Sequence, residues 1–236
     1  MERVALITGA SKGLGRAIAR EYARRGLRLV LTARGKAELD AVVAELTSTT
    51  ELVALAGDVA DPAHARCLVE LAKARFGPVD VLVNNASSLG ASPLPELADY
   101  PLPTLEEVVR VNLVAPLQLI QLVLPAMRER QAGLIVNVTS DAAVEAYPTW
   151  GGYGASKAAL EQASRVLAAE LAGSGIRVYV VDPGDMNTQM HQEAEPGVDL
   201  SNLPDPEAVA PAFVRLLDAT APFERIQAAA LLNPSS

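Results

Sequence analysis

The sequence predicts an α/β fold, in which a doubly wound parallel sheet lies between two layers of helices in a three-layer α/β/α domain. Three observations predict it. The 236 residues suit a single domain, 1–236, and no linker or repeat divides them. Short apolar runs rich in Val, Leu and Ile show no alternation, as in parallel strands buried on both faces. Longer helical patterns separate these runs, which gives the strand–helix–strand repeat of a doubly wound sheet.

Each predicted strand is one of these apolar runs. In chain order they read RVALIT (3–8), LRLVLTA (27–33), ELVALAG (51–57), VDVLVNN (79–85), GLIVNVTS (133–140) and IRVYVVDP (176–183). The intervals predict helices at 14–26, 36–47, 62–76, 104–130, 154–174 and 206–219, followed by a short strand at 226–231. The irregular stretches 86–103, 141–152 and 185–205 each follow a strand, where long loops usually bind ligands. We interpret 185–205 as a lid over a substrate site.

Composition and charge exclude several classes of partner. The net charge is −8, so nucleic acid and anionic membranes are poor partners. Polar residues and prolines interrupt the most apolar segment, 111–127, which predicts a buried helix instead of a membrane span. Cys67 is the only cysteine and the N-terminus has no leader-like segment, so we expect a cytoplasmic protein without disulfides. We expect Cys67 in the core, His64 at the surface, and no metal site.

Glycines, polar residues and one proline follow the predicted strands at the points where the strands end. They are Gly9, Gly13, Gly15, Arg34, Asp58, Asn84, Asn85, Ser140, Pro183 and Gly184. The carboxyl ends of parallel strands meet at one edge of the sheet, where open α/β folds keep their ligand crevice. The pattern therefore predicts a ligand site at that edge.

The loop TGASKGLG (8–15) joins the first strand to the first helix and predicts the phosphate-binding turn of a Rossmann fold. Its glycines permit a tight turn, and the N–H groups at the helix start face an anion. The spacing is GxxxGxG, and an ordinary βα turn is the alternative. Gly9 to Gly13 also fits the G-x-S-x-G elbow of serine hydrolases. That elbow belongs in mid-sheet with an upstream oxyanion loop, whereas here it follows the first strand.

The end of the second strand discriminates between dinucleotides. An acidic residue there would bind the adenosine ribose hydroxyls, whereas this chain has Ala33 followed by Arg34. Arg34, with Lys12 in the glycine loop, suits a 2'-phosphate, so we expect NADP(H) as the cofactor. The alternative is that both cations are merely solvated at the surface.

The stretch YGASK places Tyr153 and Lys157 four residues apart, and so on one face of a helix. Either they form a solvated surface pair, or the lysine cation lowers the pKa of a phenol that takes part in proton transfer. Ser140 ends the fifth strand, and Asn112 lies on the preceding long helix. Pro116 has no N–H for the Asn112 carbonyl, so we expect that carbonyl to bind a water linked to Lys157.

In this order the motifs resemble those of the short-chain dehydrogenase/reductase family. The shared stretches are TGASKGLG, GDV (57–59), NNAS (84–87), VN (111–112), Ser140, YGASK and PGDMNT (183–188). The resemblance implies a catalytic tetrad of Asn112, Ser140, Tyr153 and Lys157. It implies cofactor contacts from Gly9, Ser11, Lys12, Gly13, Leu14, Gly15, Arg34, Asp58, Val59, Asn85, Ala86, Tyr153, Lys157, Pro183, Gly184, Met186 and Thr188.

The resemblance therefore implies an NADPH-dependent oxidoreductase that reduces a ketone or aldehyde to an alcohol, with Tyr153 as the proton donor. The cofactor supplies the hydride, while Ser140 holds the carbonyl. Two alternatives stay open. One is a dinucleotide-binding sensor or scaffold without turnover, against which the intact catalytic side chains argue. The other is an epimerase or dehydratase of the extended branch of the family, against which the glycine spacing argues.

Two features depart from the family pattern. Ser87 replaces the glycine of the usual NNAG, near the expected position of the cofactor ribose. The chain ends in IQAAALLNPSS, where relatives carry a glycine-rich tail that helps to build a tetramer. We therefore expect a homodimer through the helices 104–130 and 154–174, and leave the tetramer open.

The segment EAYPTWGGYGASK predicts the substrate class. Trp150, the only tryptophan, stands three residues before Tyr153, and the segment resembles benzil-reductase-like and sepiapterin-reductase-like members of the family. A flat indole favours an aromatic, dicarbonyl or otherwise flat apolar compound. We expect Tyr147, Met190 and His191 to line the substrate site together with Trp150. The alternative is that Trp150 packs under the loop or at a subunit contact.

Overall fold

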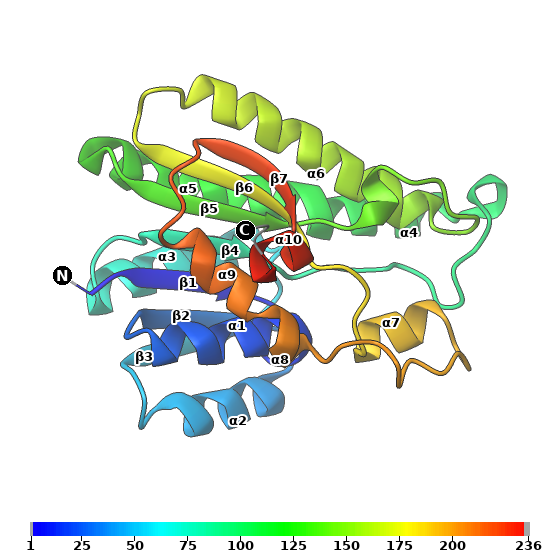
Figure 1. The fold of residues 1–236 in the computed structure, drawn as a ribbon, viewed down its shortest axis with the longest axis horizontal. Coiled ribbons are helices and arrows are strands. Elements are labelled where there is room, and N and C mark those ends of the chain that lie inside the picture. The colour runs from blue at the N-terminus through cyan, green and yellow to red at the C-terminus, as the bar shows by residue number, and fades with distance from the viewer. Residues whose placement is uncertain (1, 234–236) are drawn as a thin grey trace.

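A sheet of seven parallel strands forms the middle layer of the structure, a computed structural model that describes residues 2–233. The strand order is β3-β2-β1-β4-β5-β6-β7, so the chain starts inside the sheet and winds outward in both directions (Figure 1). The strands are β1 Val4–Thr8, β2 Arg28–Ala33, β3 Leu52–Ala56, β4 Val81–Asn84, β5 Gly133–Val138, β6 Ile176–Asp182 and β7 Phe223–Gln227. The predicted doubly wound α/β fold is confirmed.

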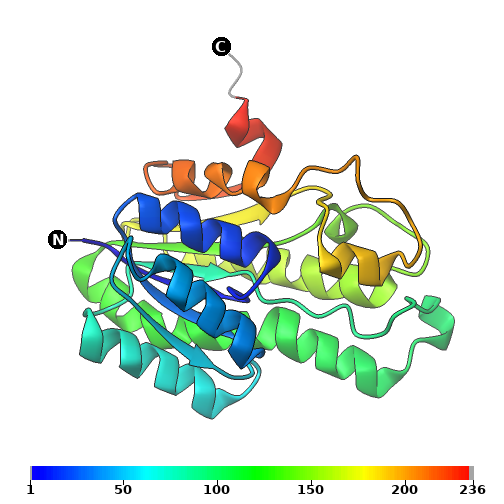
Figure 2. The same ribbon diagram turned by 90° about the horizontal axis from the view of Figure 1, so that it is seen from below.

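Helices cover both faces of the sheet (Figures 1 and 2). One layer holds α1 Gly13–Arg24, α2 Lys36–Leu46, α8 Pro206–Val209 and α9 Pro211–Leu216. The other holds α3 Pro62–Arg75, α5 Ala115–Arg130 and α6 Gly151–Glu170. Every residue of β1 is buried, because each face of the strand lies against a helix layer. This burial on both faces is the physical reason that the strands read as apolar runs without alternation.

Several predicted elements differ from the structure. The expected strand 226–231 is wrong, since β7 ends at Gln227 and helix α10, Ala228–Leu232, follows it. The expected helix 206–219 is divided into α8 and α9, because Pro211 starts the second helix and has no N–H for the preceding turn. The expected helix 104–130 comprises α4 (Leu102–Val109), a π-helical turn (Arg110–Val114) and α5. The end of the C-terminal tail, 234–236, lies outside the described residues.

Helix α3 corrects both predictions made for its residues. Its buried face includes His64, whereas Cys67 is exposed. His64 Nε2 shares a 2.8 Å hydrogen bond with Thr32 Oγ1, and the ring lies so close to Gly57 that a Cβ there would come within 2.3 Å of it. These partners come from outside the helix, so its own pattern did not reveal the buried imidazole.

The stretch Leu102–Arg130 is long and apolar enough to cross a membrane, by length and composition alone. Half of its apolar window is buried inside the fold. Helix α5 contributes Leu119, Ile120 and Val123 to the core between the helix layer and the sheet. The buried side of α5 thus agrees with the buried helix that the sequence predicted within 111–127.

Candidate active site

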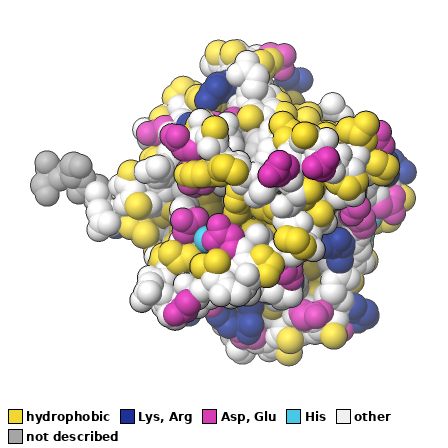
Figure 3. Space-filling model, turned by 90° about the vertical axis from the view of Figure 1, so that its right-hand side faces the viewer, with side chains coloured by type: hydrophobic (Ala, Val, Ile, Leu, Met, Phe, Trp, Pro, Cys, Tyr) yellow, Lys and Arg dark blue, Asp and Glu magenta, His cyan; other side chains and the backbone are white. Residues whose placement is uncertain are grey.

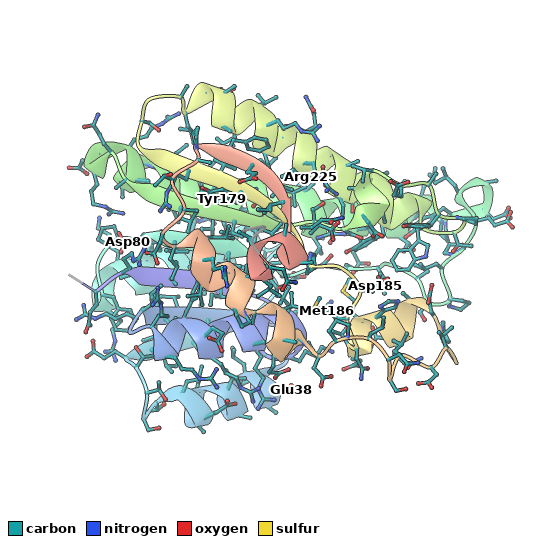
Figure 4. The ribbon with its side chains drawn as sticks, viewed as in Figure 1. Glu38, Asp80, Tyr179, Asp185, Met186 and Arg225 are labelled. Carbon is teal, nitrogen blue, oxygen red and sulfur yellow. The ribbon has the colours of Figure 1, made fainter. Side chains whose placement is uncertain are left out.

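A cavity of about 270 Å³ opens at the carboxyl edge of the sheet, on the face shown in Figure 3. Ser140 and Tyr153 line it, together with Pro183 and Gly184 after β6. All four predicted substrate residues line the same cavity: Tyr147, Trp150, Met190 and His191. The predicted lid also contributes to the cavity, with lining residues between Asp185 and Glu195. Asp185 and Met186 lie between β6 and α7 (Gln189–Ala194), as Figure 4 shows.

The glycine loop between β1 and α1 has the shape of a phosphate cradle. Gly9 and Gly13 have positive φ angles of 66° and 53°, which residues with a Cβ rarely adopt. A Cβ on Gly15 would lie 2.3 Å from the Gly9 carbonyl oxygen, so the loop closes this tightly only with glycine there. Asn85 Nδ2 donates to the Thr8 and Gly9 carbonyls at 2.9 and 3.3 Å, which ties the loop to β4. This bare backbone at a helix start fits the phosphates of a dinucleotide.

The other predicted cofactor residues border the same edge. Lys12 Nζ donates to Gln189 Oε1 at 2.8 Å and so links the glycine loop to α7. Arg34 is exposed after β2, and Asp58 Oδ1 accepts the Ala60 N–H at 2.9 Å. The remaining members of the set lie in the segments that follow β1, β3, β4 and β6: Ser11, Leu14, Val59, Ala86, Pro183, Gly184, Met186 and Thr188.

Tyr153 and Lys157 lie on the buried side of α6. Tyr153 is 8% exposed and Lys157 is 2% exposed, which rules out a solvated surface pair. Lys157 Nζ donates to the Val138 carbonyl at 2.9 Å and lies 5.5 Å from the centroid of the Tyr153 ring. A buried cation is thus held beside a buried phenol.

The pKa values of this pair correct one expectation. Burial raises the pKa of Tyr153 to about 12, and hydrogen bonds from Ser87 and Ser140 oppose this only in part. Burial also lowers the pKa of Lys157 to about 8. The lowered phenol pKa that we expected from the lysine is therefore wrong, since burial of the phenolate dominates the pKa of Tyr153. At neutral pH the phenol keeps its proton and the lysine keeps its charge.

Ser140 is held by the residue that follows it. Its Oγ donates to Asp141 Oδ1 at 3.0 Å and accepts the Ala142 N–H at 3.2 Å. Asp141 Oδ2 accepts a second hydroxyl, from Tyr147, at 2.8 Å. A ligand carbonyl that binds Ser140 must therefore compete with a carboxylate for its proton.

Asn112 is fully buried, and its side chain joins three segments. Oδ1 accepts from Ser87 Oγ at 3.1 Å and from the Ser88 N–H at 2.8 Å. Nδ2 donates to the Ser88 carbonyl and to Ser156 Oγ, both at 2.9 Å. The amide thus ties the loop after β4 to α6, and with it fixes the start of the helix that carries Tyr153.

The backbone around Asn112 departs from α-helical geometry. The Ala115 N–H donates to the Arg110 carbonyl, five residues back, as in a π-turn. Pro116 then has no N–H to offer Asn112. Both features fit a carbonyl available to water, and the water itself stays a prediction.

The sequence reasoning missed several residues of this site. Ser87 hydrogen-bonds to both Tyr153 and Asn112, and its only signal was the departure from NNAG. Behind Ser140, Arg225 on β7 (Figure 4) donates from Nε to both Glu161 oxygens, at 2.9 and 3.0 Å. Arg225 also lies 3.6 Å from Asp182 at the end of β6. This buried charge network depends on three separate elements, so no local pattern pointed to it.

Comparisons with known proteins agree with this geometry. The sequence profile of the short chain dehydrogenase family matches residues 3–199. The 2-(R)-hydroxypropyl-CoM dehydrogenase of Xanthobacter autotrophicus is 37% identical over 199 residues, covering 81% of this chain and 78% of that protein. A short chain dehydrogenase of Pseudocercospora fijiensis is 35% identical over 191 residues, covering 80% of this chain and 61% of that protein.

Among solved structures, the alcohol dehydrogenase of the archaeon Thermococcus sibiricus, complexed with 5-hydroxy-NADP, superimposes with a TM-score of 0.85. It is 29% identical, and the match covers 96% of each chain. The similarity thus extends over the glycine loop, the sheet edge and the helix that carries Tyr153.

Proposed function

From the premise that the chain belongs to the short-chain dehydrogenase/reductase family, as an NAD(P)-dependent oxidoreductase, we propose that it is an NADPH-dependent carbonyl reductase. The observation that carries the proposal is the protonated, buried phenol of Tyr153 at the wall of the cavity, beside the buried ammonium of Lys157. A proton donor so placed serves reduction of a carbonyl directly. A sensor or scaffold needs no such group.

The residues of this chain perform the proton side of the reaction. A bound nicotinamide dinucleotide supplies the hydride to the carbonyl carbon. Tyr153 gives its phenol proton to the carbonyl oxygen, since its pKa of about 12 keeps that proton in place at neutral pH. Ser140 donates to the same oxygen once it leaves Asp141. The Lys157 ammonium then stabilises the phenolate until a proton from solvent restores the phenol.

The choice of NADPH rests on the charges at the end of β2. Ala33 provides no carboxylate for the ribose hydroxyls, and Arg34 is exposed next to it. Lys12 stands in the glycine loop, with its Nζ on Gln189. Two cations and the lack of an acid at position 33 suit a 2'-phosphate, and the Glu38 carboxylate, which lies beside Gly35, is the acidic group close to this position.

The walls of the cavity support a flat apolar substrate. Trp150 and Tyr153 meet edge to face, with ring centroids 5.7 Å apart. Trp150 and Met190 pack against the small apolar cluster that includes Tyr153. We propose ketones with an aromatic or other flat group as the substrate class.

The test is consumption of NADPH by the purified chain against a panel of aromatic ketones, diketones, aliphatic ketones and aldehydes. We expect NADPH oxidation that depends on an aromatic ketone or diketone, and much weaker oxidation of NADH. Tight NADPH binding by calorimetry, with no oxidation against any carbonyl, would show a sensor or scaffold instead.

A further inference from the structure

The charged side chains of the cavity are almost all acidic. Four carboxylates line it: Asp141, Asp182, Asp185 and Glu195. The other titratable side chains of the lining are His191 and the tyrosines. No Lys or Arg among the described residues lines it. Figure 3 shows acidic side chains bordering the central hollow, while Lys and Arg lie farther out on this face. The ionisable side chains that line the cavity are therefore predominantly carboxylates.

One of these carboxylates has a partner of opposite charge, since Asp182 lies 3.6 Å from Arg225. Glu195 lies 3.6 Å from the His191 imidazole. Within residues 2–233, Asp141 and Asp185 make no ion pair. Asp141 accepts hydrogen bonds from two hydroxyls, and hydroxyls leave its charge in place.

The uncompensated charge acts on the aromatic rim of the cavity. The pKa of Tyr147 is raised, first by its hydrogen bond to Asp141 and further by the negative charges of Asp141, Glu145 and Asp185. The carboxylates are thus close enough to one phenol to disfavour another negative charge there. A ligand that brings a positive charge to this rim would relieve the same repulsion.

Aromatic side chains line the same cavity as these carboxylates. Tyr147 donates its hydroxyl hydrogen to Asp141, and Trp150 packs on Tyr153. Aromatic faces attract organic cations, and carboxylates beside them add charge complementarity. The cavity therefore combines a proton donor for a carbonyl with the side chains that bind an ammonium group.

We propose that the natural substrate is a carbonyl compound carrying a cationic amine, protonated or quaternary, and that carbonyl compounds bearing carboxylate or phosphate groups are poor substrates. This proposal rests on the reductase function proposed above for the same site. Asp185 and Asp141 recognise the cation, and Trp150 and Tyr147 contact its apolar surroundings.

The experiment uses three acetophenones that differ at one position. Their para substituents are trimethylammonium, the neutral isostere tert-butyl, and carboxylate. Binding to the purified protein is measured by calorimetry, and kcat/KM by NADPH oxidation. We expect the cation to bind at least about tenfold more tightly than its neutral isostere, and the carboxylate to bind most weakly. The advantage of the cation should fall as salt is added, since a half-exposed charge contact is screened.

Asp185→Asn is the diagnostic variant, because Asp141 also holds Ser140. It should weaken binding of the trimethylammonium compound about three- to tenfold and leave the tert-butyl compound unchanged. Glu170→Gln, an exposed site at the end of α6, removes the same charge away from the cavity and serves as the matched control. It should change neither.

The outcomes separate this proposal from the reductase function. Equal or tighter binding of the tert-butyl or carboxylate compound, or an Asp185→Asn effect equal to that of Glu170→Gln, overturns the cationic substrate. If neutral ketones are still reduced in that case, the reductase function stands. Selective binding of the cation without NADPH oxidation against any ketone would support the charge preference and overturn the reductase.

Discussion

The glycine loop and the substrate cavity share one edge of the sheet, but different forces hold them. The shape of the loop depends on its own backbone, through positive φ angles at Gly9 and Gly13 and a contact at Gly15 that excludes any Cβ, and one side chain, Asn85, ties it to β4. The cavity is held by side chains from separate elements, such as the bonds of Ser140 and Tyr147 to Asp141. A backbone cradle suits the phosphate groups, which all dinucleotides share, whereas a cavity lined by side chains can discriminate between substrates.

The two sides also differ in charge. Lys12 and Arg34 belong to the loop side, and carboxylates dominate the cavity side. This difference in charge would favour the anionic dinucleotide on the loop side and the proposed cationic substrate on the cavity side. Variants that affect one side alone test this division.

Tyr153→Phe should separate the two sides most strongly. The phenyl ring keeps its packing on Trp150, but the proton donor is lost, so turnover should fall about 10²–10⁴-fold. NADPH binding, measured by calorimetry, should stay nearly unchanged. A variant that turns over at a near-normal rate would contradict the role given to the phenol.

Lys157→Met should lose turnover and yet stabilise the fold at neutral pH. The fall of the Lys157 pKa from 10.5 to about 8 corresponds to about 3 kcal/mol of folding stability that burial of the charge costs. The variant also loses the hydrogen bond to the Val138 carbonyl, which reduces its net gain in stability. The unfolded chain binds the extra proton between these pH values, so wild-type stability rises with pH across that window. The advantage of the variant, measured by urea unfolding, should be full below pH 8 and vanish near pH 10.5. An advantage independent of pH would contradict the buried charge.

Arg34→Ala tests the loop side alone. A hydrogen bond to a charged group is worth about 1.5–3 kcal/mol, so kcat/KM with NADPH should fall roughly 10–150-fold. Values with NADH should not change, and Lys12→Ala should reduce the NADPH preference further. Lys36→Ala, whose ammonium is paired with Asp40, is the control. Equal efficiency with both cofactors in the unmutated protein would remove the basis for the NADPH assignment.

The difference between the glycine loop and the cavity also explains which features could be predicted from the sequence. The loop was predictable because its glycines act through local sterics, and the YGASK pair because four residues make one helical turn. His64, Cys67 and Ser87 were misjudged or overlooked because their environment comes from distant segments: Thr32 on β2, the phase of α3 against the sheet, and the π-turn at Asn112. The raised pKa of Tyr153 has the same origin, since burial is a property of the whole fold.

Ser87→Ala should show a smaller effect that belongs to the cavity side. The hydrogen bond from Ser87 lowers the pKa of Tyr153, so its loss should raise that pKa and shift the pH profile of alcohol oxidation to higher pH. Oxidation at a fixed pH should slow about tenfold for a change of one pKa unit. Ser88→Ala is the control, because the Ser88 hydroxyl accepts only the Gly90 N–H. Identical profiles in the two variants would show that Ser87 matters only for packing.

Trp150→Ala should produce the smallest effect and tests how the cavity selects. Trp150 lines the cavity and also packs on Tyr153, so truncation affects substrate contact and proton-donor position together. Trp150→Phe retains an aromatic contact for Tyr153 while shortening the flat surface offered to a ligand. Aromatic stacking adds about 0.5–1.5 kcal/mol, so kcat/KM for benzil-type diketones should fall roughly 2–13-fold in Trp150→Ala and less in Trp150→Phe. Small aliphatic ketones gain nothing from stacking, so their kcat/KM should fall only because the Tyr153 phenol is displaced. An equal loss on both substrate classes, with a lower melting temperature, would mean that Trp150 supports the fold and that selection on this side depends on the carboxylates alone.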